Sequence, residues 1–289
     1  MVLLSNLLVL YVGLGLLGIC VGSFLNVVVH RLPSMLRFQW QCHERHSLET
    51  TGQRPANLIH PRSHCPHCSA VIKARHNIPL ISYAILRAKC AACQHPISIR
   101  YPIVELLTAM ITIYAGFTFG PSIALPFSLL YCWLMITLCF IDIKTQLLPD
   151  NLTLPLLWLG IMANYSALFT TLESAVLGAI LGYLFFWSIY QIHRLLTGKQ
   201  GMGYGDFKLI AAIGAWVGWE LLPMVIFLSS IGGLLFGLVA ILLKHYHYNS
   251  PIPFGPFLTG AGLITLFGGD TSFYRYYQII DFIQSSMWY

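Results

Sequence analysis

Charged residues are scarce in this chain. Asp, Glu, Lys and Arg make up 9% of its 289 residues, whereas about 25% is usual in soluble globular proteins. Apolar residues reach 57%, and the mean hydropathy is +0.71. So few charges cannot cover a surface that faces water, so most of the chain is expected to face lipid. The composition therefore excludes an ordinary soluble enzyme or binding module.

The few charges are distributed unevenly. Between Arg31 and Arg100 there are ten Lys or Arg residues and two acids, Glu44 and Glu49, for a net charge of +8. The remainder carries six basic and eight acidic residues, for a net charge of −2. A basic polar insert therefore interrupts an apolar chain. Residues 1–29 hold no charge and no evident cleavage site, so we expect an uncleaved first helix.

Apolar runs recur on both sides of the insert. They predict an all-α polytopic membrane protein, a bundle of about eight transmembrane helices with a cytoplasmic four-cysteine insert. We divide the chain into a first transmembrane helix (1–29), the basic insert (30–101) and a transmembrane bundle that holds the candidate catalytic residues (102–289). The runs are 2–29, 102–119, 123–141, 152–169, 175–192, 207–219, 224–243 and 257–267.

The basic residues predict the orientation of this bundle. If the insert is cytoplasmic, every Lys and Arg except Arg275 falls on the cytoplasmic side, which is the arrangement that the positive-inside rule favours. Three of the Gly-x-x-x-Gly patterns in the sequence also predict close helix contacts in lipid. They begin at Gly18, Gly178 and Gly233. We find no convincing internal repeat, which gives an inverted-repeat transporter little support.

Four cysteines in the insert have the spacing of a metal site. Cys65, Cys68, Cys90 and Cys93 form C-x2-C-x21-C-x2-C, close to the spacing of a zinc ribbon. Two disulfides or a redox pair are the alternatives, and a reducing cytoplasm disfavours disulfides. Four thiolates complete the shell of a structural Zn²⁺ and leave no position for a catalytic water. The neighbouring His64, His67 and His95 are then surplus and are expected to be exposed.

Two acids lie at ends of apolar runs and are candidates for catalysis. Asp142 closes the third run, and Asp206 opens the sixth. By the predicted topology both lie at the cytoplasmic boundary. Ionisable groups at such positions are functional candidates. Two facing carboxylates can perform aspartic-protease chemistry, in which the ionised one takes a proton from water and the protonated one hydrogen-bonds the scissile carbonyl.

Structural roles compete with this interpretation. Asp206 could simply cap its helix, and Asp150 and Glu105 could do the same. Asp142 is harder to explain in this way, because an acid at a helix C-terminus opposes the macrodipole. Gly201, Gly203 and Gly205 precede Asp206, but no strand comes before them as a dinucleotide-binding site requires. We interpret Gly203 and Gly205 as backbone support that lets a peptide approach Asp206.

Together these motifs resemble those of the bacterial type IV prepilin peptidases, aspartic proteases of the Gly-x-Gly-Asp type. The resemblance runs nearly end to end. It includes the four-cysteine insert and the segments 22–33, 141–150, 203–208 and 251–256.

The resemblance implies an enzyme with two activities in the bacterial inner membrane. Its catalytic pair falls on Asp142 and Asp206, and it removes a short basic leader after glycine from prepilins and pseudopilins on the cytoplasmic side. It then methylates the exposed N-terminal residue, usually phenylalanine, using S-adenosylmethionine. No segment forms a recognisable methyl-donor motif, so the residues that bind this cofactor are not predicted. Membrane lipid is the expected surroundings, and no nucleic-acid partner is expected.

Two rival functions stay open at this point. A different Gly-x-Gly-Asp intramembrane protease could act on general transmembrane segments, although the basic insert disfavours it. A transporter or assembly scaffold could use Asp142 and Asp206 to bind cations or protons, but transport predicts acids near the bilayer midplane. The composition does not explain residues 35–60, which are polar with scattered aromatic side chains.

Overall fold

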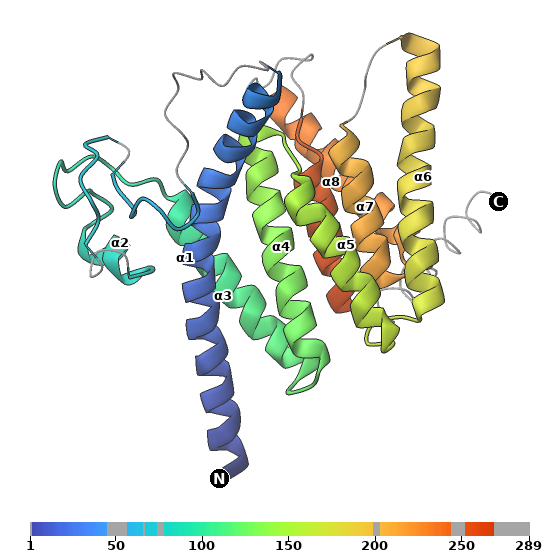
Figure 1. Cartoon of the computed structure of the whole chain (residues 1–289). Helices are drawn as coiled ribbons and strands as arrows, with labels where there is room; N and C mark the ends of the chain where they lie inside the picture. The colour runs from blue at the N-terminus through green and yellow to red at the C-terminus, as the bar shows by residue number, and fades with distance from the viewer. Residues whose placement is uncertain are drawn as a thin grey trace. The chain divides into compact units, whose positions relative to one another are not determined.

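The structure, a computed structural model, describes residues 2–44, 57–65, 67–73, 78–198, 203–243 and 252–268. Pro66, Gly201, Pro251, Arg275 and residues 45–56 lie outside the described part of the chain. The elements within it are helices (Figure 1), and no strand forms among them beyond two isolated bridges in the insert. The predicted all-α fold is therefore confirmed. The chain divides into two compact units.

The first unit holds residues up to Pro121 together with Ser128–Thr137, which is the middle of α4 (Ala124–Thr145). Its long helix α1 (Val2–Glu44) packs along α3 (Arg100–Phe119), and the short helix α2 (Ile81–Ile85) lies in the insert. The helix of the predicted first span thus continues past residue 29, through Pro33, to Glu44.

Glycines allow α1 and α3 to approach closely. A Cβ on Gly18 would lie 2.6 Å from the Cα of Ala109, and a Cβ on Gly22 would lie 2.7 Å from the Cα of Glu105. Asn26 adds a polar contact, because its Nδ2 donates to the carbonyl oxygen of Tyr101 at 3.0 Å. The first Gly-x-x-x-Gly prediction is confirmed as a helix-packing face.

The second unit holds Ser122–Phe127 and the chain from Leu138 onward. Helices α5 (Asp150–Tyr165) and α6 (Leu172–Thr197) both pack on α7 (Tyr204–Val217), as Figure 1 shows. Helix α8 (Leu222–Leu242) and a final helix, Gly255–Gly268, follow. Every residue of α7 from Leu209 to Val217 is buried, as expected for a helix that is apolar on all sides.

The other two glycine patterns behave differently from each other. Gly178 of α6 meets Gly214 of α7 backbone to backbone. A Cβ added to Gly178 would overlap the carbonyl oxygen of Gly214. The second pattern is thus confirmed. Gly233 and Gly237 of α8 instead face side chains, those of Phe254 and Ile252 among them, and not the backbone of another helix.

Each of the eight predicted apolar runs is helical, but the helices differ in length. Five are long and apolar enough to cross a membrane, namely α1 over residues 8–42, α3, α4, α6 and α8. Helix α5 has 16 residues and α7 has 14, so α7 extends about 21 Å, less than the roughly 30 Å of a bilayer core. The chain is therefore a multi-pass membrane protein whose shorter helices include its most buried one.

Candidate functional site

Asp142 lies in the last turn of α4 and is almost completely buried, with 5% of its surface exposed. Its Oδ2 accepts a hydrogen bond from the backbone N–H of Gly255 at 3.0 Å. Gly255 is the first residue of helix Gly255–Gly268. A carboxylate at the end of one helix is thus held by the beginning of another, whose macrodipole favours negative charge.

Gly255 is a site residue to which the sequence analysis gave no role. A Cβ at this position would lie 2.6 Å from Oδ2 of Asp142 and 3.0 Å from its Cγ, so only glycine lets the backbone come this close. The available signal was the sequence Pro253-Phe254-Gly255-Pro256, a glycine between two prolines. Such a segment predicts a helix start, but it does not identify the partner in α4.

Asp206 lies in the first turn of α7, three residues after the N-cap Gly203. Burial and the nearby charge of Asp142 raise the pKa of Asp206, and a hydrogen bond from the Gly203 backbone opposes them. The two carboxylates are therefore close enough to influence each other, although 64 positions separate them in sequence. Asp206 also has the reach-back geometry of an N3 acid, so the capping role and proximity to Asp142 coexist.

The two flanking glycines have different surroundings. Gly203 is exposed, and a Cβ there would be 3.8 Å from Oδ2 of Asp206, an ordinary contact distance. Gly205 is tightly packed, because a Cβ there would lie 2.7 Å from the Cβ of Leu148. Gly205 thus brings the first turn of α7 against the loop that follows α4. Access of a peptide backbone to Asp206, the role predicted for both glycines, stays a prediction.

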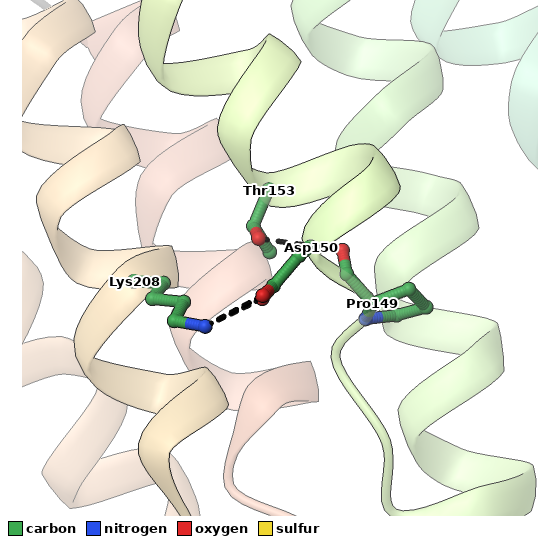
Figure 2. Close-up of polar contacts among 4 residues, drawn as sticks. All are labelled: Pro149, Asp150, Thr153 and Lys208. Atoms are coloured by element: carbon green, nitrogen blue, oxygen red, sulfur yellow. Dashed lines mark hydrogen bonds and ion pairs between the residues drawn. The ribbon is translucent and has the colours of Figure 1, made fainter. Parts of the chain in front are cut away.

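Asp150 is not the capping residue that the sequence suggested. The N-cap of α5 is Pro149, and Asp150 stands in the first helical turn. Its carboxylate receives two hydrogen bonds from Nζ of Lys208, at 2.7 and 2.8 Å (Figure 2). Thr153 donates to the Pro149 carbonyl oxygen at 3.3 Å and closes the same turn. An ion pair therefore joins the first turn of α5 to the N-terminal half of α7.

Glu105 is not a helix cap either. It lies within α3, is buried, and accepts the backbone N–H of Leu80 at 2.8 Å. Leu80 has a positive φ of 56° and precedes α2. Glu105 therefore links the start of α2 to α3 within the first unit. This role is structural, since its carboxylate is already hydrogen-bonded to the Leu80 N–H.

The four insert cysteines converge as predicted. Their Sγ atoms all lie within 4.8 Å of one another, and each is a free thiol. Cys65 and Cys93 are 3.9 Å apart, Sγ to Sγ, far beyond a disulfide bond. Four sulfurs about 2.3 Å from a tetrahedral Zn²⁺ would be roughly 3.8 Å apart. The residues fit zinc, although metal identity stays a proposal.

The two Cys-x-x-Cys turns of this cluster have the same backbone hydrogen-bond pattern. Ser69 N donates to Cys65 O and Cys65 N to Ala70 O, while Gln94 N donates to Cys90 O and Cys90 N to His95 O. Ser69 and Gln94 both have positive φ, at 57° and 58°. Backbone N–H groups of Cys68 and His67 lower the pKa of Cys65 to about 6, which favours the thiolate that binds metal.

The nearby histidines stand outside the sulfur cluster. His64, His67 and His95 are exposed, as predicted, and the rings of His67 and His95 stack with centroids 4.3 Å apart. None of the three is part of the group that converges on the metal position.

The described residues do not form a recognisable site for a methyl donor. Asn26 Oδ1 is a buried acceptor without a hydrogen-bond partner, which is the kind of atom that a ligand could engage. The Asn26 side chain is only 4% exposed, so a molecule as large as S-adenosylmethionine has no access to it.

Comparisons with known proteins cover most of the chain. Residues 16–119 match the profile described as Bacterial Peptidase A24 N-terminal domain, and residues 129–238 match the Type IV leader peptidase family. No solved structure matches.

Three similar proteins are each named prepilin leader peptidase/N-methyltransferase. The protein from Aeromonas hydrophila is 51% identical over 260 residues, covering 89% of this chain and 90% of its own. That from Pseudomonas aeruginosa is 47% identical over 92% of this chain and 93% of its own. The protein from Legionella pneumophila is 46% identical over 91% of this chain and 92% of its own.

Proposed function

This chain belongs to the type IV leader peptidase family, and from that premise we propose that it is a membrane aspartic endopeptidase acting on prepilins and pseudopilins. Its product would be the mature protein without its short basic leader. The observation that carries the proposal is that two helix-end acids of the second unit, Asp142 in the last turn of α4 and Asp206 in the first turn of α7, belong to one electrostatic neighbourhood, since the charge of Asp142 contributes to raising the pKa of Asp206. Their positions also argue against transport, because they occupy a last and a first helical turn and not the middle of a span.

The proposed cleavage divides the work between two carboxyl groups. The carboxylate of Asp142 takes a proton from a water molecule, whose oxygen attacks the scissile carbonyl carbon. Protonated Asp206 donates its proton to the carbonyl oxygen, which gives a neutral tetrahedral intermediate. The C–N bond then breaks, the leaving nitrogen takes the proton held by Asp142, and a hydroxyl of the intermediate returns a proton to Asp206. Both carboxyl groups end in their starting states.

The cytoplasmic side is the proposed location of this chemistry. Support comes from the sixteen basic residues, of which only Arg275 falls outside the predicted cytoplasmic loops. Pilin leaders that are themselves basic would remain on that side, so cleavage there needs no transfer of charge across lipid. The location proposed for the whole protein is the bacterial inner membrane.

Two further components complete the proposal. Cys65, Cys68, Cys90 and Cys93 would hold one structural Zn²⁺, which supplies folding stability and no activated water, since four thiolates fill its shell. The names of the relatives include an N-methyltransferase, and we extend that activity to this chain. The acceptor would be the amine exposed by cleavage, and S-adenosylmethionine would be the donor.

Cleavage of a prepilin by purified protein in detergent tests the peptidase proposal. Asp142→Asn and Asp206→Asn should each reduce cleavage to background while the proteins still insert and purify as folded monodisperse species. Asp150→Asn is the matched control, because it makes the same change to an acid outside the pair. Robust cleavage by either of the first two variants would overturn the assignment.

A further inference from the structure

Asp142 has an unfavourable place in its own helix. An acid in the last turn of α4 meets the negative end of that helix's macrodipole, and only 5% of its surface reaches solvent. Burying a carboxylate requires a compensating donor. The donor is Gly255, whose N–H reaches Oδ2 at 3.0 Å from the first residue of helix Gly255–Gly268.

We infer that Gly255 is a positioning residue of the peptidase: its backbone N–H holds Asp142 as an oriented carboxylate and thereby makes Asp142, and not Asp206, the base. The inference rests on the proposed function and deepens it. Gly255 itself touches neither water nor substrate in this scheme. It acts through the atom that it binds.

The helix that carries Gly255 is built to offer this donor. The first N–H groups of a helix have no intrahelical partner, and here the first ladder bonds come later, from Phe257 and Leu258 to the Phe254 carbonyl oxygen. Leu258 and Thr259 are buried, which fixes the helix in the second unit. Phe254 contacts Phe186 of α6 edge to face, with centroids 6.0 Å apart, and so fixes the entry into the helix.

Glycine is required here by space and not by backbone flexibility. A Cβ would lie 2.6 Å from Oδ2, so any other residue pushes the carboxylate away from the donor. Gly260 in the same helix provides a contrast, because nothing lies within 4 Å of a Cβ built there. The chain thus offers two glycines, one turn and a half apart, that differ in whether a methyl group disturbs Asp142.

The surroundings of the two acids support different roles for them. A hydrogen bond to the charged form favours that form, and the N-terminus of helix Gly255–Gly268 adds to it for Asp142. Asp206 lies in the first turn of α7 and also accepts a backbone N–H, from Gly203, and burial disfavours the charged form of both acids. What is added for Asp206 is the charge of Asp142, which favours its protonated form. One carboxylate beside one carboxylic acid is the arrangement that the proposed cleavage requires.

Two variants at residue 255 test the inference in the full-length protein. Replacing the amide of Gly255 with an ester, by nonsense suppression with glycolic acid, removes the N–H and adds no atom. Gly255→Ala keeps the N–H and displaces the carboxylate. A hydrogen bond to a charged group has a strength that predicts a fall in kcat of roughly tenfold to a hundredfold. The KM for the prepilin should stay within about twofold, because Gly255 does not contact substrate.

The controls separate this role from a general packing effect. Gly260→Ala should keep wild-type kcat and KM, since its methyl group enters open space. A similar loss in Gly260→Ala, or a wild-type kcat in the ester variant, would overturn the inference. Should Gly255→Ala fail to fold, the ester variant decides alone. If Asp142→Asn also cleaves, the proposed function has failed, whereas an inactive Asp142→Asn beside a fully active ester variant refutes only the role of Gly255.

Discussion

Asp206 is the residue whose surroundings give the clearest prediction about pH. Burial and the charge of Asp142 raise its pKa, and the Gly203 backbone only partly offsets them. Cleavage uses its protonated form, so a raised pKa keeps the enzyme active to higher pH than an ordinary aspartic acid near 3.9 would allow. Activity should then be lost as the pH rises through the pKa of Asp206.

The measurement is the pH dependence of kcat/KM with a prepilin peptide. We expect a falling alkaline limb, and Asp150→Asn should leave its midpoint in place because Asp150 is outside the pair. A rate that keeps rising through strongly alkaline pH would contradict the assignment of Asp206 as the acid. Unfolding midpoints measured over the same pH range show whether lost activity reflects titration or loss of the fold.

Asp150 and Lys208 allow a second prediction at this scale. Their ion pair is bidentate but partly exposed, with 51% of the Asp150 side chain and 32% of the Lys208 side chain accessible. Exposed pairs contribute about 0.2–1 kcal/mol. Asp150→Asn should therefore lower the unfolding free energy by less than about 1 kcal/mol and leave kcat within a few-fold. Thermal unfolding in detergent and the cleavage assay check this, and loss of all cleavage would give Asp150 a catalytic role.

At the residue scale, the sequence identifies candidate acids but not the contacts that they make with distant positions. Asp142 and Asp206 were identifiable as acids at the ends of apolar runs, because charge is rare enough in this chain for each acid to be weighed. Gly255 was not identifiable, since its contact with Asp142 joins positions 113 apart. Asp150 was given the wrong role for a similar reason: a first-turn acid looks like a cap until its partner on another helix is known.

At the scale of elements, the insert gives a prediction about metal. One Zn²⁺ per chain should be bound by Cys65, Cys68, Cys90 and Cys93, with Zn–S distances of about 2.3 Å. Metal analysis and X-ray absorption measure both quantities. Changing Cys65 and Cys68 to Ser should release the metal and increase protease sensitivity of the insert, whereas Cys42→Ser, the matched control outside the cluster, should do neither. Metal-free protein containing two disulfides would show that the zinc interpretation is wrong.

Helix packing shows how far local patterns reach at this scale. The pattern at Gly178 predicted a close helix contact, and α6 does meet α7 there at Gly214. The partner could not be predicted, because the pattern shows that one face of α6 is small but does not show which helix meets that face. Apolar runs likewise located eight helices, but hydropathy does not distinguish lipid from protein as the apolar surroundings. Helix α7 was therefore expected to be a span, although it is short and enclosed by other helices.

For the whole molecule, the topology is a prediction that labelling can test. Single cysteines placed in residues 57–65 or 78–99 of the insert should react with membrane-impermeant maleimide from the cytoplasmic side only. Cysteines near Gly120 and Thr171, in the turns after α3 and before α6, should react from the opposite side only. Modification of the insert from outside intact cells would overturn the orientation, and with it the reducing surroundings that favour zinc over disulfides.

The last prediction concerns the two activities of the whole protein, which we expect to be separable. The amine exposed by cleavage must be neutral to attack the methyl group of S-adenosylmethionine. An α-amino pKa of about 7.7–8.0 leaves a usable neutral fraction near pH 7. Methyl transfer therefore depends on proximity and orientation more than on a pair of carboxyl groups. Asp142→Asn should still methylate a synthetic pre-cleaved peptide, measured by transfer of labelled methyl, although it cannot process the precursor.

Variants of the insert provide the converse experiment. Changing Cys65 and Cys68 to Ser should reduce methylation of the pre-cleaved peptide at least as much as it reduces cleavage of the precursor, because we expect the amine to be methylated on the cytoplasmic side to which the insert is assigned. A folded Asp142→Asn protein that has lost methylation of the pre-cleaved peptide would contradict the separation. The carboxylate would then serve both reactions, first by taking a proton from water and afterwards by taking one from the ammonium group of the new N-terminus.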